Sequence, residues 1–274
     1  MPNRDLEGKI AIITGAGSGI GAGIARVLHD RGATLALCDL FGESAEKTAK
    51  NLSEKYIYDS VDVTKISDLE KFRDKALENY GKIDILVSNA GVIGAKGFAE
   101  RKNYSQKDWD DTYDVNLIGV VNSADAITDH MKSNKYGKII NIASHGGRKP
   151  RGLGDMHRGN VQTPYLVSKA AVIQYTHLLA IEMGQFNINV NAICPGSVDG
   201  DRIERVISAD AKKRGVSPET IKEIYLRQNS LRKFTNANDI STMAYHLASK
   251  AGHGISGQAI AIDGNTEGLF NWLS

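Results

Sequence analysis

The sequence predicts a doubly wound α/β fold, in which a parallel sheet of about seven strands carries helices on both faces. Short apolar runs rich in Val and Ile alternate with longer amphipathic stretches, an order typical of parallel α/β proteins. Few polar residues interrupt these runs, as expected of strands that are covered on both sides. No repeat or Pro-rich linker divides the chain, so we expect a single domain over residues 1–274.

The expected strands and helices follow one another in regular alternation. Strands are predicted at residues 9–14, 34–39, 57–62, 83–88, 138–143, 188–194 and 258–262. Helices are predicted at residues 19–31, 43–54, 67–80, 107–133, 163–184, 201–213, 217–227 and 238–248. Two of these begin with a hydroxyl residue before a proline, Thr163 and Ser217, which is a common helix start.

Composition excludes several classes of protein. The chain is 41% hydrophobic and 24% charged, close to globular averages, and its net charge of +2 lacks the basic excess of a nucleic-acid binder. Neither an apolar leader nor a run long enough to span a membrane is present, so we expect a cytoplasmic protein without membrane contact. Cys38 and Cys194 lie apart in apolar runs, which predicts buried thiols and no metal site.

A glycine-rich turn follows the first expected strand and leads directly into a helix. It contains Gly15, Gly19, Ile20 and Gly21. Glycines let the chain turn tightly and bring backbone N–H groups against a pyrophosphate at the positive end of the helix. A glycine-rich turn can also be an ordinary tight loop, but the strand before it and the helix after it favour a dinucleotide site.

Asp39, at the end of the second expected strand, specifies the nucleotide. A carboxylate at this place can accept hydrogen bonds from both hydroxyls of an adenosine ribose, and it repels a 2′-phosphate. An NADP site normally has a basic residue nearby, whereas the next cation after Asp39 is Lys47. We therefore predict NAD as the cofactor.

Tyr165 and Lys169 lie four residues apart at the start of an expected helix, so both side chains lie on the same face. An ammonium beside a phenol favours the phenolate, which makes a tyrosine usable as a base. Spacing alone is also met by ordinary surface pairs, so this interpretation depends on the rest of the pattern.

Together these residues resemble the short-chain dehydrogenase/reductase family, its NAD(P)-dependent YxxxK type, over essentially the whole chain. The resemblance rests on Gly15-x-x-x-Gly19-x-Gly21, Asn89-Ala90-Gly91, Asn116, Ser144, Tyr165-x-x-x-Lys169 and Pro195-Gly196, in family order. It implies a Rossmann-like fold and a homotetramer.

The resemblance also implies a role for each matching residue. Tyr165 would be the general acid/base, Ser144 would hydrogen-bond the substrate oxygen, and Lys169 would assist Tyr165 and hold the nicotinamide ribose. Asn116 would support a water in a proton relay. The remaining cofactor contacts implied are Asp62 and Val63 at the adenine, Asn89 at the adenosine ribose and the backbone of Val198 at the carboxamide. Taken singly, Asn89, Asn116 and Ser144 are also explained as strand caps or local hydrogen-bond partners.

Two segments depart from the family pattern. An insert (145–163) is longer than usual for the family and is basic, with Arg148, Lys149, Arg151 and Arg158. One hypothesis is that these cations bind an anionic or polyhydroxylated substrate; the alternative is a solvated loop or subunit contact. The segment around residues 197–230 resembles a substrate lid, and the apolar tail 268–273 is either ordinary packing or a contact with a neighbouring subunit.

The predicted function is hydride transfer between nicotinamide and a secondary alcohol or ketone, with a small sugar, polyol or hydroxy acid favoured by the polar insert. One alternative is an NADPH-dependent reductase of 3-oxoacyl thioesters, against which Asp39 argues. Another is a non-catalytic dinucleotide-binding sensor or scaffold, which would have no chemical need for the four residues of the proton relay.

Overall fold

All seven expected strands form, and they pair in parallel as one sheet of order β3-β2-β1-β4-β5-β6-β7. The computed structural model describes residues 4–97, 104–149 and 163–266. The strands are β1 (Ile10–Thr14), β2 (Thr34–Asp39), β3 (Ile57–Ser60), β4 (Ile85–Ser88), β5 (Gly137–Ile142), β6 (Ile188–Pro195) and β7 (Ala259–Ile262). The order reverses between β1 and β4, which is where such sheets bind ligands at the carboxyl ends of their strands.

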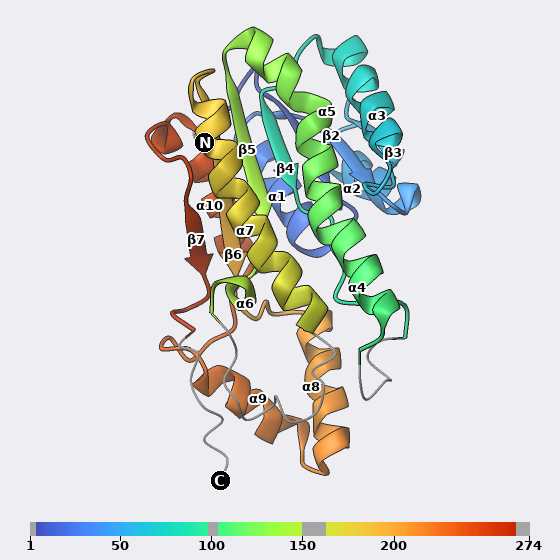
Figure 1. The fold of residues 1–274 in the computed structure, drawn as a ribbon, viewed down its shortest axis with the longest axis vertical. Helices are drawn as coiled ribbons and strands as arrows, with labels where there is room; N and C mark the ends of the chain where they lie inside the picture. The colour runs from blue at the N-terminus through green and yellow to red at the C-terminus, as the bar shows by residue number, and fades with distance from the viewer. Residues whose placement is uncertain (1–3, 98–103, 150–162, 267–274) are drawn as a thin grey trace.

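Helices cover both faces of the sheet (Figure 1). One face carries α1 (Gly19–Asp30), α2 (Gly42–Leu52) and α10 (Ala237–Ala248), and the other carries α3 (Ile66–Tyr80), α5 (Gly119–Asn134) and α7 (Thr163–Gly184). The others are α4 (Gln106–Tyr113), α6 (His145–Arg148), α8 (Asp201–Arg214), α9 (Pro218–Arg227) and a 3-10 turn η4 (Lys250–Gly252). The described part of the chain contains no helix long and apolar enough to cross a membrane.

Neighbouring side chains of a strand pack into two apolar cores, one on each face of the sheet. In β1, Ala11 and Ile13 pack with α1 and α10, whereas Ile12 packs with α3, α5 and α7. In β4, Leu86 shares the core of Ile12. Because side chains alternate across a strand, uninterrupted apolar runs fill both layers.

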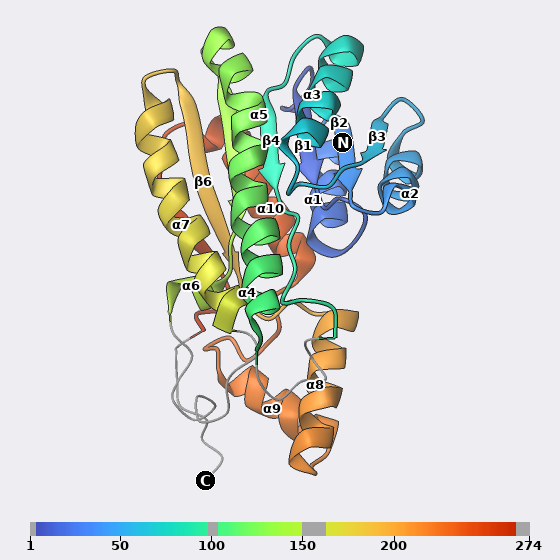
Figure 2. The same cartoon turned by 45° about the vertical axis from the view of Figure 1, so that its right-hand side comes forward.

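Helices α8 and α9 lie beyond the carboxyl ends of the strands, apart from the two helical layers (Figure 2). Ile203, Ile207 and Ala211 of α8 pack on Ile221 and Ile224 of α9. Helix α9 begins as expected, since the Ser217 hydroxyl accepts a hydrogen bond from the N–H of Thr220 and Pro218 follows it. The hairpin thus has a small apolar core of its own.

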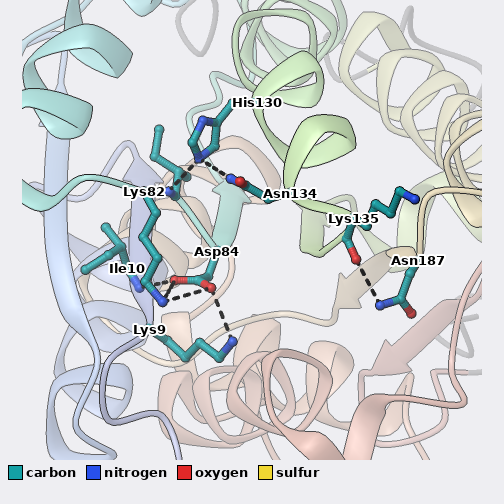
Figure 3. Close-up of polar contacts among 9 residues, drawn as sticks. Lys9, Ile10, Lys82, Asp84, His130, Asn134, Lys135 and Asn187 are labelled. Atoms are coloured by element: carbon teal, nitrogen blue, oxygen red, sulfur yellow. Dashed lines mark hydrogen bonds and ion pairs between the residues drawn. The ribbon is translucent and has the colours of Figure 1, made fainter.

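At the opposite end of the sheet, where the strands begin, a cluster of ion pairs and hydrogen bonds forms around Asp84 (Figure 3). Asp84 is 5% exposed, and its Oδ2 accepts a 2.9 Å hydrogen bond from the N–H of Ile10. Its carboxylate also pairs with Lys9 at 3.2 Å and Lys82 at 3.1 Å. A buried carboxylate is stable only with such partners, so this cluster joins the starts of β1 and β4.

His130 of α5 adds an uncharged contact at the same end (Figure 3). Its Nε2 lies 3.2 Å from the N–H of Ile83 and 2.8 Å from Nδ2 of Asn134. A ring nitrogen that accepts from a backbone N–H carries no proton, and burial holds the pKa of His130 below its ordinary value.

Apart from shifts of at most two residues at element ends and the unpredicted 3-10 turn η4, the structure differs from the predicted elements in two places. The single helix expected over 107–133 is divided into α4 and α5 by a π-turn, η2 (Asp114–Ile118). The short helix α6 was not expected, because it lies in the glycine-containing start of the insert. Both differences lie beside the candidate site. Helix α7 begins with Thr163 itself as its first residue, one position earlier than a cap would place it.

Candidate active site

The glycine-rich turn has the shape that its glycines permit. Gly15 and Gly19 have φ angles of 63° and 54°, in the left-handed region that favours glycine. A Cβ on Gly15 would lie 2.8 Å from Cα of Ala90, and one on Gly21 would meet the Gly15 carbonyl, so these two close approaches exclude side chains. Beside Gly19 the space is open. The start of α1 thus borders open space at Gly19, an arrangement compatible with a pyrophosphate site.

Asp39 is bound to this turn. Its Oδ2 accepts a 3.0 Å hydrogen bond from the N–H of Gly17, and its Oδ1 accepts one of 3.1 Å from the N–H of Phe41. A Cβ on Gly17 would lie 2.5 Å from Cβ of Ser44 and 2.9 Å from Oδ2 of Asp39, so only glycine fits. The carboxylate is held at the edge of the glycine-rich turn, and each of its oxygens can accept further hydrogen bonds.

Asn89 connects the end of β4 to the same turn. Its Nδ2 donates to the carbonyl oxygens of Thr14 and Gly15 at 3.0 and 2.9 Å. Its N–H and that of Ala90 donate to the Thr14 hydroxyl. The expected contact of Asn89 with an adenosine ribose stays a prediction, whereas its amide group clearly fixes the turn.

Asp62 and Val63 follow β3 at the carboxyl end of the sheet, the same end as the glycine-rich turn. Burial alone would raise the pKa of Asp62, but hydrogen bonds from Thr64 and the Lys65 ammonium hold it below its ordinary value. The Val63 side chain packs against Gly119, where a Cβ would lie 2.6 Å from its Cγ2. Two exposed apolar side chains that sequence reasoning missed, Leu40 and Phe41, follow Asp39. Their signal is the position directly after Asp39, the acid predicted to bind a ribose.

Asn116 is buried at the centre of the π-turn η2. Its Oδ1 accepts from the N–H of Val92 at 2.8 Å, and its Nδ2 donates to the Val92 carbonyl at 2.8 Å and to Ser168 Oγ at 3.0 Å. π-turns are rare and frequently occur at functional sites. The Asn116 amide thus joins the loop after β4 to α7.

Lys169 reaches the same junction from α7. It is 4% exposed, and its Nζ donates a 2.8 Å hydrogen bond to the carbonyl of Ile142. A Cβ on Gly91 would lie 3.1 Å from Asn116 Oδ1 and 3.5 Å from Lys169 Nζ, so the turn after β4, η2 and α7 converge here. The Lys169 Nζ lies 5.9 Å from the centre of the Tyr165 ring, which is half-buried.

Ser168, which sequence reasoning missed, links these groups. Its Oγ accepts from Asn116 Nδ2 and donates to the carbonyl of Tyr165 at 2.8 Å. The only sequence signal is a hydroxyl beside a lysine on a buried helical face. A hydrogen-bonded path therefore runs from η2 to the turn of α7 that carries Tyr165.

Ser144 stands at the end of β5 and caps α6. It is 6% exposed, and its Oγ accepts a 3.2 Å hydrogen bond from the N–H of Gly146. A hydroxyl that accepts from one side keeps its own proton for a partner on the other. The cap thus leaves Ser144 able to donate.

Val198 lies on the far side, where the chain leaves β6. It forms a bridge with Thr235 through the carbonyl of Ser197 and the N–H of Asp199. Neighbouring residues of an extended chain direct their polar groups to opposite sides, so the N–H and carbonyl of Val198 point away from Thr235. This orientation suits a backbone contact with a bound group.

Part of the predicted basic insert can be placed. Arg148 and Lys149, at the end of α6 and just after it, are exposed at the carboxyl end of the sheet. Arg151 and Arg158, like the tail 268–273, lie outside the described residues.

Comparison with known proteins agrees with this arrangement. The short chain dehydrogenase family matches residues 9–211. Galactitol 2-dehydrogenase of Agrobacterium fabrum is 32% identical over 270 residues, covering 98% of this chain and 99% of that protein. The 3-oxoacyl-(acyl-carrier-protein) reductase FabG of Thermotoga maritima is 32% identical over 262 residues, covering 94% and 98%.

A solved structure agrees along nearly the whole chain. NAD+-bound xylitol dehydrogenase superimposes with a TM-score of 0.85 at 28% identity, covering 95% of this chain and 99% of that one. The family match, the sheet order and the convergence of the glycine-rich turn, η2 and α7 lead to one conclusion. The chain belongs to the short-chain dehydrogenase family.

Proposed function

We propose that this protein is an NAD-dependent dehydrogenase that interconverts a secondary alcohol and a ketone, with Tyr165 as general acid/base. The observation that carries the proposal is the convergence of Asn116 from η2 and Lys169 from α7 at Gly91, with Tyr165 four residues before Lys169 on α7. Such an arrangement serves proton transfer at a substrate oxygen.

The residues at the sheet's carboxyl end fit a dinucleotide. Gly15 and Gly21 leave no room for side chains, Gly19 borders open space, and Asp39 is held at the edge of the turn. The adenosine half would lie against Asp39, with Leu40 and Phe41 beside it, and the pyrophosphate against the start of α1. When bound, the nicotinamide ring supplies the hydride acceptor or donor.

The protein's own residues handle the proton. Ser144 donates its hydroxyl hydrogen to the substrate oxygen, which places that oxygen beside the Tyr165 hydroxyl. Tyr165 then takes the alcohol proton during oxidation or gives one during reduction, with the Lys169 ammonium 5.9 Å from the centre of its ring. Asn116 and Ser168 hold η2 and α7 in place for this exchange.

A small polar substrate is favoured, such as a sugar, a polyol or a hydroxy acid. The similarity to galactitol 2-dehydrogenase and to xylitol dehydrogenase supports this class. Arg148 and Lys149 add exposed positive charge near the site. Reduction of 3-oxoacyl thioesters with NADPH is the second candidate, since FabG of Thermotoga maritima is equally similar. Asp39 favours the first.

A homotetrameric, single-domain enzyme of the cytoplasm is part of the same proposal. Val167, Leu178 and Ile181 form an apolar stripe along α7 and are 40%, 57% and 79% exposed, which suits contact with a second copy. Cys38 and Cys194 are buried free thiols, and burial raises the pKa of Cys194 to about 11, as suits unreactive thiols in a reducing compartment. Residues 197–230, with α8 and α9, would act as the lid.

Sedimentation of Ile181→Asp tests the proposed contact between copies along α7, because a carboxylate buried at that contact would dissociate the assembly.

The deciding experiment compares wild type with Tyr165→Phe. Initial rates of nicotinamide absorbance change are measured on a panel of polyols, sugars, hydroxy acids and hydrophobic alcohols, with NAD and NADP in parallel. We expect turnover by wild type with NAD, and loss of turnover in Tyr165→Phe with NADH binding unchanged. Equal inactivity of both proteins across the panel would favour the sensor or scaffold, and turnover by Tyr165→Phe near the wild-type rate would refute the proposed base.

A further inference from the structure

Helix α6 is a single helical turn that lies between Ser144, the start of α7 and the end of β6. It begins directly after Ser144, contacts the start of α7 and reaches the end of β6. Its sequence, His145-Gly146-Gly147-Arg148, contains two glycines, although glycine is a poor helix former. The contacts of the first three residues explain this choice.

Gly147 packs directly on the backbone of α7. A Cβ added there would lie 2.5 Å from the carbonyl carbon of Lys169 and 2.7 Å from the backbone nitrogen of Ala170. Carbon atoms in contact are normally about 3.5–4.0 Å apart, so a methyl group would force α6 and α7 apart by about 1 Å. These atoms belong to the helix backbone and cannot rotate away.

Gly146 has a different neighbour. A Cβ there would meet the Cδ2 atom of Leu166, the end of a flexible side chain. Its N–H donates to Ser144 Oγ, so the same residue that contacts α7 also holds the Ser144 hydroxyl. The spacing between Ser144 and the Tyr165 turn therefore depends on how closely α6 approaches α7.

His145 anchors α6 on its other side. Its Nδ1 lies 2.9 Å from the carbonyl oxygen of Pro195 at the end of β6. A carbonyl oxygen only accepts, so Nδ1 carries the proton and donates. Helix α6 is thus held between α7, through Gly147, and β6, through His145.

We propose that α6 is a positioning element: Gly147 and His145 set the distance at which Ser144 faces Tyr165, and they act on the rate of the chemical step. The inference rests on the proposed roles of Ser144 and Tyr165. Neither Gly147 nor His145 is assigned contact with substrate or cofactor. Their effect is geometric, because a donor displaced by about 1 Å from the reacting oxygen can cost about 10²-fold in rate.

The test measures kcat, KM and the substrate deuterium isotope effect in Gly147→Ala, with the dissociation constant of NADH measured by fluorescence. We expect kcat to fall by about 10²-fold and the isotope effect to rise as hydride transfer becomes rate-limiting. The dissociation constant of NADH should stay unchanged, because the adenosine half binds at the glycine-rich turn. Gly184→Ala is the matched control, since no atom lies within 4 Å of a Cβ at Gly184, the last residue of α7.

A second pair of variants tests the hydrogen bond between His145 and Pro195 without introducing a steric clash. His145→Ala removes the anchor, and we expect kcat to fall by about fivefold to tenfold, the equivalent of one hydrogen bond. His145→Asn places an amide N–H where Nδ1 stood and should restore most of the rate, which a merely structural role would not explain.

Two results would overturn the inference: wild-type kcat in Gly147→Ala, or equal rates in His145→Ala and His145→Asn. If Gly147→Ala fails to fold, the His145 pair decides alone. Activity retained in Tyr165→Phe would instead refute the proposed function, so the two failures are distinguishable.

Discussion

Asp39→Asn isolates the charge that is expected to select NAD over NADP. The substitution keeps the size of the side chain and an oxygen that can accept from the N–H of Gly17, which lies 3.0 Å from Oδ2 in the native protein. It removes the negative charge from the edge of the glycine-rich turn. Any gain in the use of NADP then reports electrostatic repulsion rather than a change of shape.

The magnitude follows from the position of the carboxylate. An oxygen that hydrogen-bonds the ribose 2′-hydroxyl lies about 4 Å from a charge on a 2′-phosphate. Two unit charges at that distance repel by about 1 kcal/mol in water and about 4 kcal/mol at the effective dielectric of a protein surface. Asp39 is half-exposed, so we expect the preference for NAD to fall by about 10- to 100-fold.

The assay is the ratio of kcat/KM with NAD to that with NADP, at two ionic strengths. Glu43→Gln is the matched control, because it removes an exposed carboxylate from the first turn of α2. The control should keep the native ratio. An unchanged ratio in Asp39→Asn would refute the electrostatic argument and transfer nucleotide selection to other residues.

Two further predictions concern stability and cofactor binding. Burial lowers the pKa of His130 in the folded protein, so protonation of this residue favours unfolding. The contribution of the neutral side chain to stability is therefore complete above pH ~6.5 and is lost as the pH falls through the folded-state pKa. His130→Gln keeps an acceptor for the N–H of Ile83, and denaturant titrations between pH 7 and pH 5 should show a smaller loss of stability than in wild type; parallel curves would contradict this. Gly21→Ala places a methyl group against the Gly15 carbonyl, and fluorescence titration should show NADH binding weakened by roughly 5- to 150-fold. Native affinity would mean that the turn adapts.

The sequence predicted the sheet well because strands buried on both faces leave an unmistakable apolar run. Ala11, Ile12 and Ile13 of β1 show why: each points into a core, whichever face it lies on. The order of the strands, by contrast, was not predicted and comes from the structure. Periodicity alone does not state which strand lies beside which.

The π-turn around Asn116 was beyond prediction for a physical reason. It closes a hydrogen bond from the N–H of Gly119 to the carbonyl of Asp114, five residues back instead of four, and no residue type in this short stretch signals that change. Helix α6 was missed because a four-residue helix has no periodicity, and its glycines indicate a turn. Ser168 was missed because its importance lies in a hydrogen bond with Asn116, which is 52 residues away in the sequence, and not in its residue type.

The apolar core shared by α8 and α9 has a consequence for how this enzyme could change over evolution. Because Ile203 and Ile207 pack on Ile221 and Ile224 rather than on the sheet, the hairpin's outer positions can be substituted at little cost to the nucleotide-binding half. With the hairpin as the proposed lid, such modularity would separate the selective pressure on redox chemistry from that on substrate range. An exchange of residues 201–227 between relatives should therefore transfer substrate preference as a unit.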